Sequence, residues 1–263
     1  MDEHDWNMNR GDRMKAVKRD ELIAWINDYL EVEQFSDGCL NGLQVEGDPW
    51  IERVVCGTTA SLRLIEAACA RSAQLVIVHH GLFKGSLGDP PRVIGPWAKR
   101  LRLLLENGIS LAGYHLPLDA HSEVGNNVLL CQRLGLTPGL PLDVGFMAEA
   151  PGGMELDAFV ERVRAEINPA AQVFAAGSNR VRRVAVISGG ASSLWPVVLD
   201  SGADTFLSGE PSEHVIREIE EAGLHAIFAG HYATEVFGVQ ALGQRITDTF
   251  GIPVEFVDIP NPV

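Results

Sequence analysis

The chain has 263 residues, of which 46% are hydrophobic and 21% are charged. This is enough for a sizeable core in one large or two smaller domains. The formal net charge of −14 excludes general nucleic-acid binding, because an acidic surface repels phosphate backbones. No apolar run approaches the roughly 20 residues that span a bilayer, and residues 1–19 lack the apolar segment of a secretory signal. We therefore expect a cytoplasmic protein with no membrane association.

Residues 1–13 are polar and show no hydrophobic periodicity, which predicts a disordered tail. The cysteines further along the chain show no Cys-x-x-Cys spacing; they are Cys39, Cys56, Cys69 and Cys131. We interpret them as reduced, mostly buried thiols and not as a disulfide framework or a thiolate metal site.

The first half of the remaining chain predicts alternating helices and strands. Helices are expected at residues 20–30 and 61–70, with a strand at 53–56 between them. After Gln74, residues 75–78 are a continuous apolar run that ends in His79, His80 and Gly81, which is typical of a strand buried on both faces of a parallel sheet. A helix at 97–107 and a strand at 109–112 follow, and then a helix at 126–134.

The second half echoes the first. Residues 184–187 match 54–56, residues 203–210 match 73–80, and residues 223–231 match 108–115. Internal duplication explains this pattern, although ordinary repetition of βα units is an alternative. We predict an α/β protein with two similar duplicated domains. Their ranges are 14–137 and 138–263, with a C-terminal segment that can cross back to the first domain.

Histidines and carboxylates follow three of these strands. Neighbouring strand residues point to opposite faces, so His79 and His80 can reach two positions, which suits a pair of metals. The alternative is two hydrogen-bonded imidazoles at a crowded corner. After another strand, Asp119 lies four residues beyond His115. In the second half, His231 and Glu235 have the same spacing, which places them on one face of a helix.

Together these strand ends offer three imidazoles, two carboxylates and no thiolate: His79, His80, Asp119, His231 and Glu235. Such ligands suit two divalent transition-metal ions per chain, namely Zn, Fe, Mn, Co or Ni. Five ligands exceed the four of a closed zinc site, and they fit two metals about 3.5–4 Å apart with positions left for water. Glu210 occupies the position in the second half that matches His80 in the first half. It is a candidate general base or a partner that orients a ligand, or a simple helix-start carboxylate.

Five linked segments resemble the Nif-three-like family, whose members are also named GTP cyclohydrolase 1 type 2 homologs. The segments are residues 41–47, 76–81, 114–121, 125–127 and 230–235. The resemblance covers residues 15–260 and is to the short bacterial form, which lacks an inserted domain. It implies a dinuclear metal site in the cleft between two similar domains, with ligands at the five positions above. It also implies a toroidal homohexamer whose sites face an inner cavity.

The resemblance further implies a metal-dependent hydrolase that acts on GTP or a related nucleotide-like small molecule. Water activated by the metals would attack C8 of the purine, and Glu210 or His115 would transfer protons. A Gly-rich phosphate loop of the Gly-x-x-x-x-Gly-Lys type is missing from the sequence. The alternative is a non-catalytic metal-binding ring that binds a partner protein or handles metal. Open coordination positions favour catalysis, because structural sites are closed.

Overall fold

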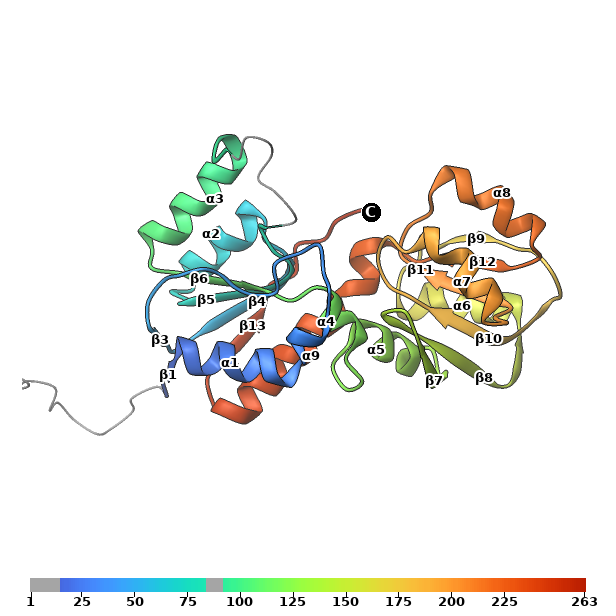
Figure 1. Ribbon diagram of the computed structural model, residues 1–263, viewed down its shortest axis with the longest axis horizontal. Coiled ribbons are helices and arrows are strands. Elements are labelled where there is room, and N and C mark those ends of the chain that lie inside the picture. Colours follow the sequence, from blue (N-terminus) through green and yellow to red (C-terminus); the bar gives the residue numbers. More distant parts are fainter. Residues whose placement is uncertain (1–14, 84–91) are drawn as a thin grey trace, which may run out of the picture.

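The computed structural model describes residues 15–83 and 92–263. The predicted disordered tail at residues 1–13 lies outside the described residues. The chain has a mixed α/β architecture arranged in two lobes, each built around one main sheet (Figure 1). The lobes meet near α4 (Leu116–Ala120), α5 (Asn126–Arg133) and the first turns of α9 (His231–Phe250).

The first sheet has the strand order β13-β4-β5-β6-β2. The strands β13, β4, β5 and β6 pair in parallel with one another, and β2 pairs antiparallel with β6. The strand β13 comes from the end of the chain and pairs with β4, so the C-terminal segment returns to the first lobe. The bounds are β2 (Gly42–Val45), β4 (Val54–Thr59), β5 (Leu75–His80), β6 (Ser110–Gly113) and β13 (Val254–Phe256).

Helices cover both faces of this sheet, with α2 and α3 on one side and α1 and α9 on the other (Figure 1). Alternation along the strands explains this arrangement. Val76 and Val78 pack beneath α2 and α3, whereas Leu75 and Ile77 pack against α1 and α9. Every residue of β5 is buried, which confirms the strand buried on both faces. The bounds are α1 (Arg19–Tyr29), α2 (Leu62–Ala70), α3 (Gly95–Glu106) and α9 (His231–Phe250).

The second sheet has the strand order β7-β8-β10-β11-β12-β9. The strands β10, β11 and β12 are parallel, and the outer strands join antiparallel. The bounds are β7 (Thr137–Leu142), β8 (Gly145–Glu155), β9 (Gln172–Phe174), β10 (Arg180–Val186), β11 (Thr205–Ser208) and β12 (His225–Phe228).

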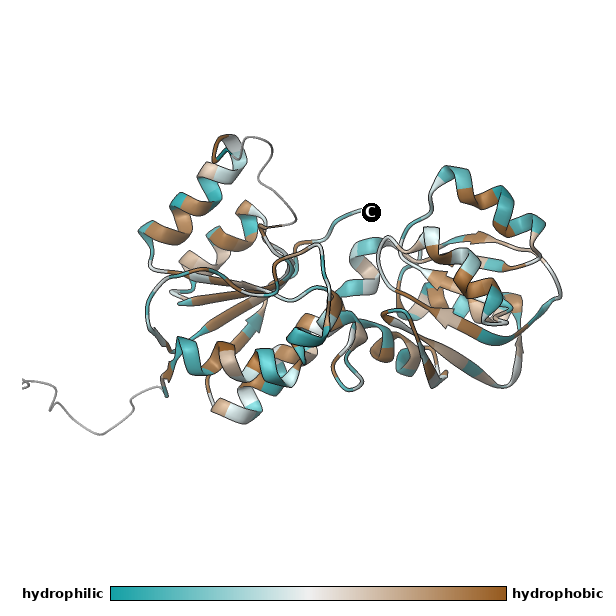
Figure 2. Ribbon diagram, in the orientation of Figure 1, coloured by the Kyte–Doolittle hydropathy of each residue, from teal (hydrophilic) through white to brown (hydrophobic). Residues whose placement is uncertain are grey.

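Helices α5 and α6 cover one face of the second sheet, and α7 and α8 cover the other. The same alternation applies, because Val184 and Val186 face α6 while Ala185 and Ile187 face α7 and α8. Hydrophobic residues follow the strands of both sheets, and α8 shows hydrophilic residues on its outer side (Figure 2). The bounds are α5 (Asn126–Arg133), α6 (Leu156–Glu166), α7 (Trp195–Asp200) and α8 (Glu213–Glu221).

Short elements complete the chain. The strands β1 (Val17–Lys18) and β3 (Trp50–Ile51) form a small antiparallel ribbon, and single turns of 3₁₀ helix occur at Val32–Gln34 and Ser192–Leu194. The segment after β6 forms the short helix α4 (Leu116–Ala120). Pro117 is tolerated there because it lies in the first turn, where a backbone N–H has no helical partner.

In the described part of the chain, no helix is long and apolar enough to cross a membrane.

Candidate metal site

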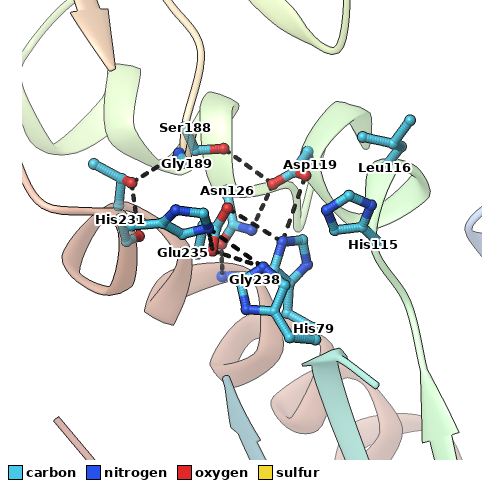
Figure 3. Close-up of polar contacts among 12 residues, drawn as sticks. His79, His115, Leu116, Asp119, Asn126, Ser188, Gly189, His231, Glu235 and Gly238 are labelled. Atoms are coloured by element: carbon cyan, nitrogen blue, oxygen red, sulfur yellow. Dashed lines mark hydrogen bonds and ion pairs between the residues drawn. The ribbon is translucent and has the colours of Figure 1, made fainter. Parts of the chain in front are cut away.

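The fold brings the predicted histidines and carboxylates to one place (Figure 3). His79 and His80 end β5, Asp119 lies in α4 just after β6, and His231 and Glu235 lie in the first two turns of α9. The carboxyl ends of parallel strands share one sheet edge, which explains why β5 and β6 deliver their residues together. The second lobe contributes Ser188 and Gly189, which follow β10 and contact the same group.

His79, Asp119 and Glu235 form a fully buried group of possible ligands, which we call the first triad. The Nε2 atom of His79 lies 3.5 Å from Asp119 Oδ2 and 3.4 Å from Glu235 Oε1. The other ring nitrogen, Nδ1, lies 2.9 Å from the backbone oxygen of Tyr114. Since that oxygen can only accept, Nδ1 carries a proton and donates it. Such a hydrogen bond fixes the tautomer and directs Nε2 toward the carboxylates.

His80, His231 and Glu235 form a second group, the second triad. Oxygen Oε2 of Glu235 lies 3.3 Å from His80 Nε2 and 3.2 Å from His231 Nε2, and the two nitrogens are 3.4 Å apart. In each triad the possible ligand atoms lie within 4.8 Å of one another. Glu235 therefore presents Oε1 to the first triad and Oε2 to the second, and it is the residue that the two triads share.

The chemistry of these side chains fits metal binding. His79 Nε2 and Glu235 Oε2 are buried, yet neither makes a hydrogen bond with the described residues. A buried polar atom without a partner costs about 1–3 kcal/mol. A cation in each triad would satisfy these atoms, because His79 Nε2 belongs to the first triad and Glu235 Oε2 faces the second. Nitrogen and oxygen donors without thiolate suit the divalent transition metals.

The pKa shifts of these side chains also fit metal binding. Burial lowers the pKa of His79, but the carboxylates of Asp119 and Glu235 outweigh burial and raise it to about 9. Burial also raises the pKa of Glu235, but the nearby His79 and His231 overcome this and hold it well below its usual range. Burial dominates at Asp119 and raises its pKa, although His79 opposes this. Asp119 and Glu235 thus favour a positive charge at His79, which is the position where a bound cation would balance these carboxylates.

Residues outside the predicted set hold Asp119 in position. Oxygen Oδ1 of Asp119 accepts hydrogen bonds from Asn126 Nδ2 at 2.8 Å and from Ser188 Oγ at 3.0 Å. This leaves Oδ2 for the first triad. Asn126 also accepts a hydrogen bond from the backbone of Gly238 in α9, so one amide links α4, α5 and α9. Asn126 lies in a segment that carried the family resemblance, but the sequence alone gave it no role.

His115 lies beside both triads, with its ring centroid 5.0 Å from that of His79 and 5.7 Å from that of His80. Its Nδ1 atom lies 3.0 Å from Asp37 Oδ1. The Asp37 carboxylate also accepts hydrogen bonds from Asn41, the backbone of Cys39 and the backbone of Leu116. Burial raises the pKa of Asp37, but these hydrogen bonds outweigh burial and lower it. Asp37 and Cys39 form a further possible ligand group with His115, but a carboxylate so fully bonded orients the imidazole better than it binds an ion.

Glu210 lies at the outer side of the second triad. Its Oε1 atom is 3.2 Å from His231 Nδ1, the ring nitrogen opposite the one that faces Glu235. The pKa of His231 is raised, first by the adjacent Glu235 carboxylate and further by Glu210, against the effect of burial. The structure therefore places Glu210 where a carboxylate orients a ligand imidazole.

Two cavities border the site. One, of about 390 Å³, is lined in part by His80 and His231. The other, of about 240 Å³, is lined in part by His115, Asp119, His231 and Glu235. Both triads therefore contribute residues to the lining of a cavity.

Fold and site together define an α/β protein with two adjoining groups of histidines and carboxylates that could bind metal and that share one glutamate. The chain belongs to the Duf34/NIF3 (NGG1p interacting factor 3) family. The sequence profile of this family matches residues 17–262. This confirms the family expected from the sequence segments.

Two curated relatives named "GTP cyclohydrolase 1 type 2 homolog" are similar along nearly their whole length. The protein of Allochromatium vinosum is 42% identical, with 95% of this chain and 100% of the relative covered. That of Pseudomonas aeruginosa is 41% identical, with 94% and 99% covered. Among solved structures, one titled "Structural genomics, protein ybgI, unknown function" has a TM-score of 0.90. It is 38% identical to this chain, and 94% of this chain and 100% of that one are covered.

Proposed function

We propose that this protein is a dinuclear metal-dependent hydrolase that acts on a nucleotide-like substrate. The observation that carries the proposal is the position of Glu235, which offers one oxygen to each triad. The two cavities beside the triads support catalysis over a purely structural role, because a catalytic metal needs an open position for water or substrate.

In this proposal the five predicted side chains hold two divalent ions: His79, His80, Asp119, His231 and Glu235. When bound, such ions supply Lewis acidity and activate water near neutral pH. The chain itself fixes the ligand atoms. The backbone oxygen of Tyr114 accepts the Nδ1 proton of His79, and the Glu210 carboxylate accepts that of His231. The Nε2 atom of each histidine then keeps a lone pair for the ion.

Proton transfer is assigned to His115. Its Nδ1–H donates to Asp37, which leaves Nε2 as the ring atom that can take up or release a proton. Asp37 stabilises the charge that His115 gains in that step. Glu210 contacts a ligand imidazole, and this geometry supports an orienting role for it more directly than the general-base role expected from the sequence.

The substrate class rests on the relatives. Their printed name refers to GTP cyclohydrolase, and opening a purine ring at C8 requires activated water, which this site would provide. We therefore propose GTP or a related purine nucleotide as the first substrate to test, in the cytoplasm.

Two further proposals concern the architecture. The halves of the chain are duplicated domains, with 14–137 and 138–263 as their ranges and the metal cleft between them. The shared parallel order of β4-β5-β6 and β10-β11-β12 supports this. The chain also assembles into a toroidal homohexamer. Exposed apolar side chains such as Ile94 and Leu140, 63% and 80% exposed, are available for contacts between copies, and light scattering would measure the assembled mass.

The function is tested by metal analysis and turnover on the same preparation. Purified protein is loaded with Zn²⁺, Mn²⁺, Fe²⁺, Co²⁺ or Ni²⁺ and incubated with GTP and related nucleotides. We expect hydrolysis that Glu235→Gln abolishes together with metal binding. Glu210→Gln should lower activity or metal affinity about 10–100-fold, as expected when a partner that orients a ligand is lost.

Glu213→Gln is the matched control for Glu210→Gln, because Glu213 is exposed and begins α8 only three residues away. It should leave metal content and turnover unchanged. Full metal occupancy without turnover on any nucleotide would refute the hydrolase. The alternative, a metal-binding ring that binds a partner or handles metal, would then replace it.

A further inference from the structure

The cavity of about 390 Å³ beside the second triad has a second wall that takes no part in the metal site. His80 and His231 line one part of it, and Trp97 and Arg100 of α3 line the cavity as well. Tyr232 and Asn261 also line it. The cavity thus joins possible metal ligands to an aromatic ring and a guanidinium group.

Trp97 and Arg100 are three residues apart on α3, so they lie on the same face of the helix. The ring of Trp97 packs against the ring of Phe83, with centroids 5.8 Å apart and planes tilted by 41°. Phe83 therefore supports the indole ring of Trp97 while that ring lines the cavity. A supported indole offers a flat surface on which another ring can stack.

Arg100 is unlike its basic neighbours on α3. Lys99 and Arg102 are exposed, whereas Arg100 is partly buried. Its Nε atom is buried and makes no hydrogen bond with the described residues. A buried N–H of a charged group without an acceptor is costly, and an anion in the cavity would supply the acceptor.

The cavity contrasts with the acidic surface of the chain. Among the described residues that line it, none is an aspartate or a glutamate, although the whole chain has a net charge of −14. Guanidinium groups form paired hydrogen bonds with phosphate oxygens. The volume lies within the range of small-molecule sites, which fits one nucleotide better than a polymer.

We infer that Trp97 and Arg100 form the substrate-recognition wall, with Trp97 stacking on a purine ring and Arg100 binding a phosphate of the same mononucleotide-sized ligand. This deepens the proposed function and rests on it for the choice of purine. The ligand would then extend along the cavity toward His80 and His231. Trp97 and Arg100 set specificity, and they hold no metal.

Binding is tested without turnover by equilibrium dialysis of the full chain with GMP, guanosine and inorganic phosphate. Both metal-loaded and chelator-treated protein are used, and thermal unfolding confirms that each variant is folded. Arg100→Gln should weaken GMP binding at least about ten-fold, the effect of a lost hydrogen bond to a charged group. Guanosine binding should change less than two-fold. Arg102→Gln on the exposed side of the same helix should leave both unchanged.

The aromatic contact is tested with Trp97→Leu and Trp97→Phe. Loss of stacking should weaken GMP and guanosine alike, by about five-fold or more, whereas phenylalanine should restore most of the affinity. Trp50→Leu is the control, because Trp50 is 52% exposed and does not line this cavity. If Trp97→Leu proves unstable, Trp97→Phe compared with Trp97→His still separates stacking from packing.

The outcomes separate this inference from the proposed hydrolase. Absence of GMP binding at millimolar concentration, or equal effects of Arg100→Gln and Arg102→Gln, would overturn the recognition wall. If the protein hydrolyses the nucleotide and Arg100→Gln leaves the KM unchanged, the recognition wall is also overturned, but the proposed hydrolase function is retained. Arg100-dependent GMP binding without turnover by the metal-loaded protein would uphold the wall and reject the hydrolase.

Discussion

Gly189→Ala tests whether the position of Glu235 controls metal binding. Gly189 has a φ of +65°, and a Cβ atom at this residue would lie 2.2 Å from Glu235 Oε1 and 3.3 Å from His231 Nε2. The carboxylate would have to retreat by about 1 Å to reach van der Waals distance. Such a shift affects both triads, because Glu235 is their shared member.

The expected loss has two separable parts. A left-handed backbone costs an alanine about 1–2 kcal/mol of folding free energy, whatever surrounds it. Displacement of Glu235 should lower the affinity for Zn²⁺ about 10–100-fold, comparable to the loss of a group that orients a ligand. Urea unfolding of metal-free protein measures the first part, and competition with a chromophoric chelator measures the second.

Gly223→Ala is the matched control. Gly223 has a φ of +72°, and a Cβ atom there would meet nothing within 4 Å. It should show the same loss of folding free energy with unchanged Zn²⁺ affinity. If Gly189→Ala binds Zn²⁺ as tightly as the unaltered protein, the reasoning that ties both triads to the position of Glu235 is refuted.

Three further outcomes are expected. Purified protein should carry up to two transition-metal equivalents, and the double variant His79→Ala with His231→Ala should retain neither, as measured by elemental analysis. Removal of bound metal by a chelator should lower Tm by about 5 °C or more, because a ligand at 100 times its Kd adds about 2.7 kcal/mol to stability. Zn²⁺ affinity should rise about ten-fold per pH unit from 7 to 9 and then level, because Zn²⁺ displaces the proton that His79 holds with a pKa of about 9.

Each of these has a result that contradicts it. Retention of both ions by the double variant would remove the assignment of the triads. An unchanged Tm after complete metal removal would show that the ions do not bind preferentially to the folded chain. Affinity that does not vary between pH 7 and 9 would mean that His79 binds no proton in the metal-free site.

The sequence was sufficient for features that depend on local periodicity. The apolar run before His79 predicted a strand buried on both faces because each of its faces needs apolar contacts, and β5 has this burial. The spacing of His231 and Glu235 predicted a shared helical face because four residues make about one turn, and α9 starts at His231. Parallel strands explained why His79 and Asp119 lie at one edge.

Only the tertiary structure decided which sheet α9 covers and how the site is completed. The helix follows β12 of the second sheet, yet it buries Val239, Leu242 and Ile246 in the core of the first lobe. An apolar helix face does not specify its partner, because burial against any apolar surface is nearly equivalent. Through this packing Glu235 reaches His79, although the two residues are 156 positions apart in the numbering.

The same limit applies to the supporting residues. Asp37 orients His115 from 78 residues away, and Ser188 reaches Asp119 from 69 residues away. Single aspartates and serines give no sequence signal of their partners, since many exposed positions carry the same residue types. Their roles follow from hydrogen-bond geometry, which exists only after both lobes have folded and brought β5, α4 and α9 together.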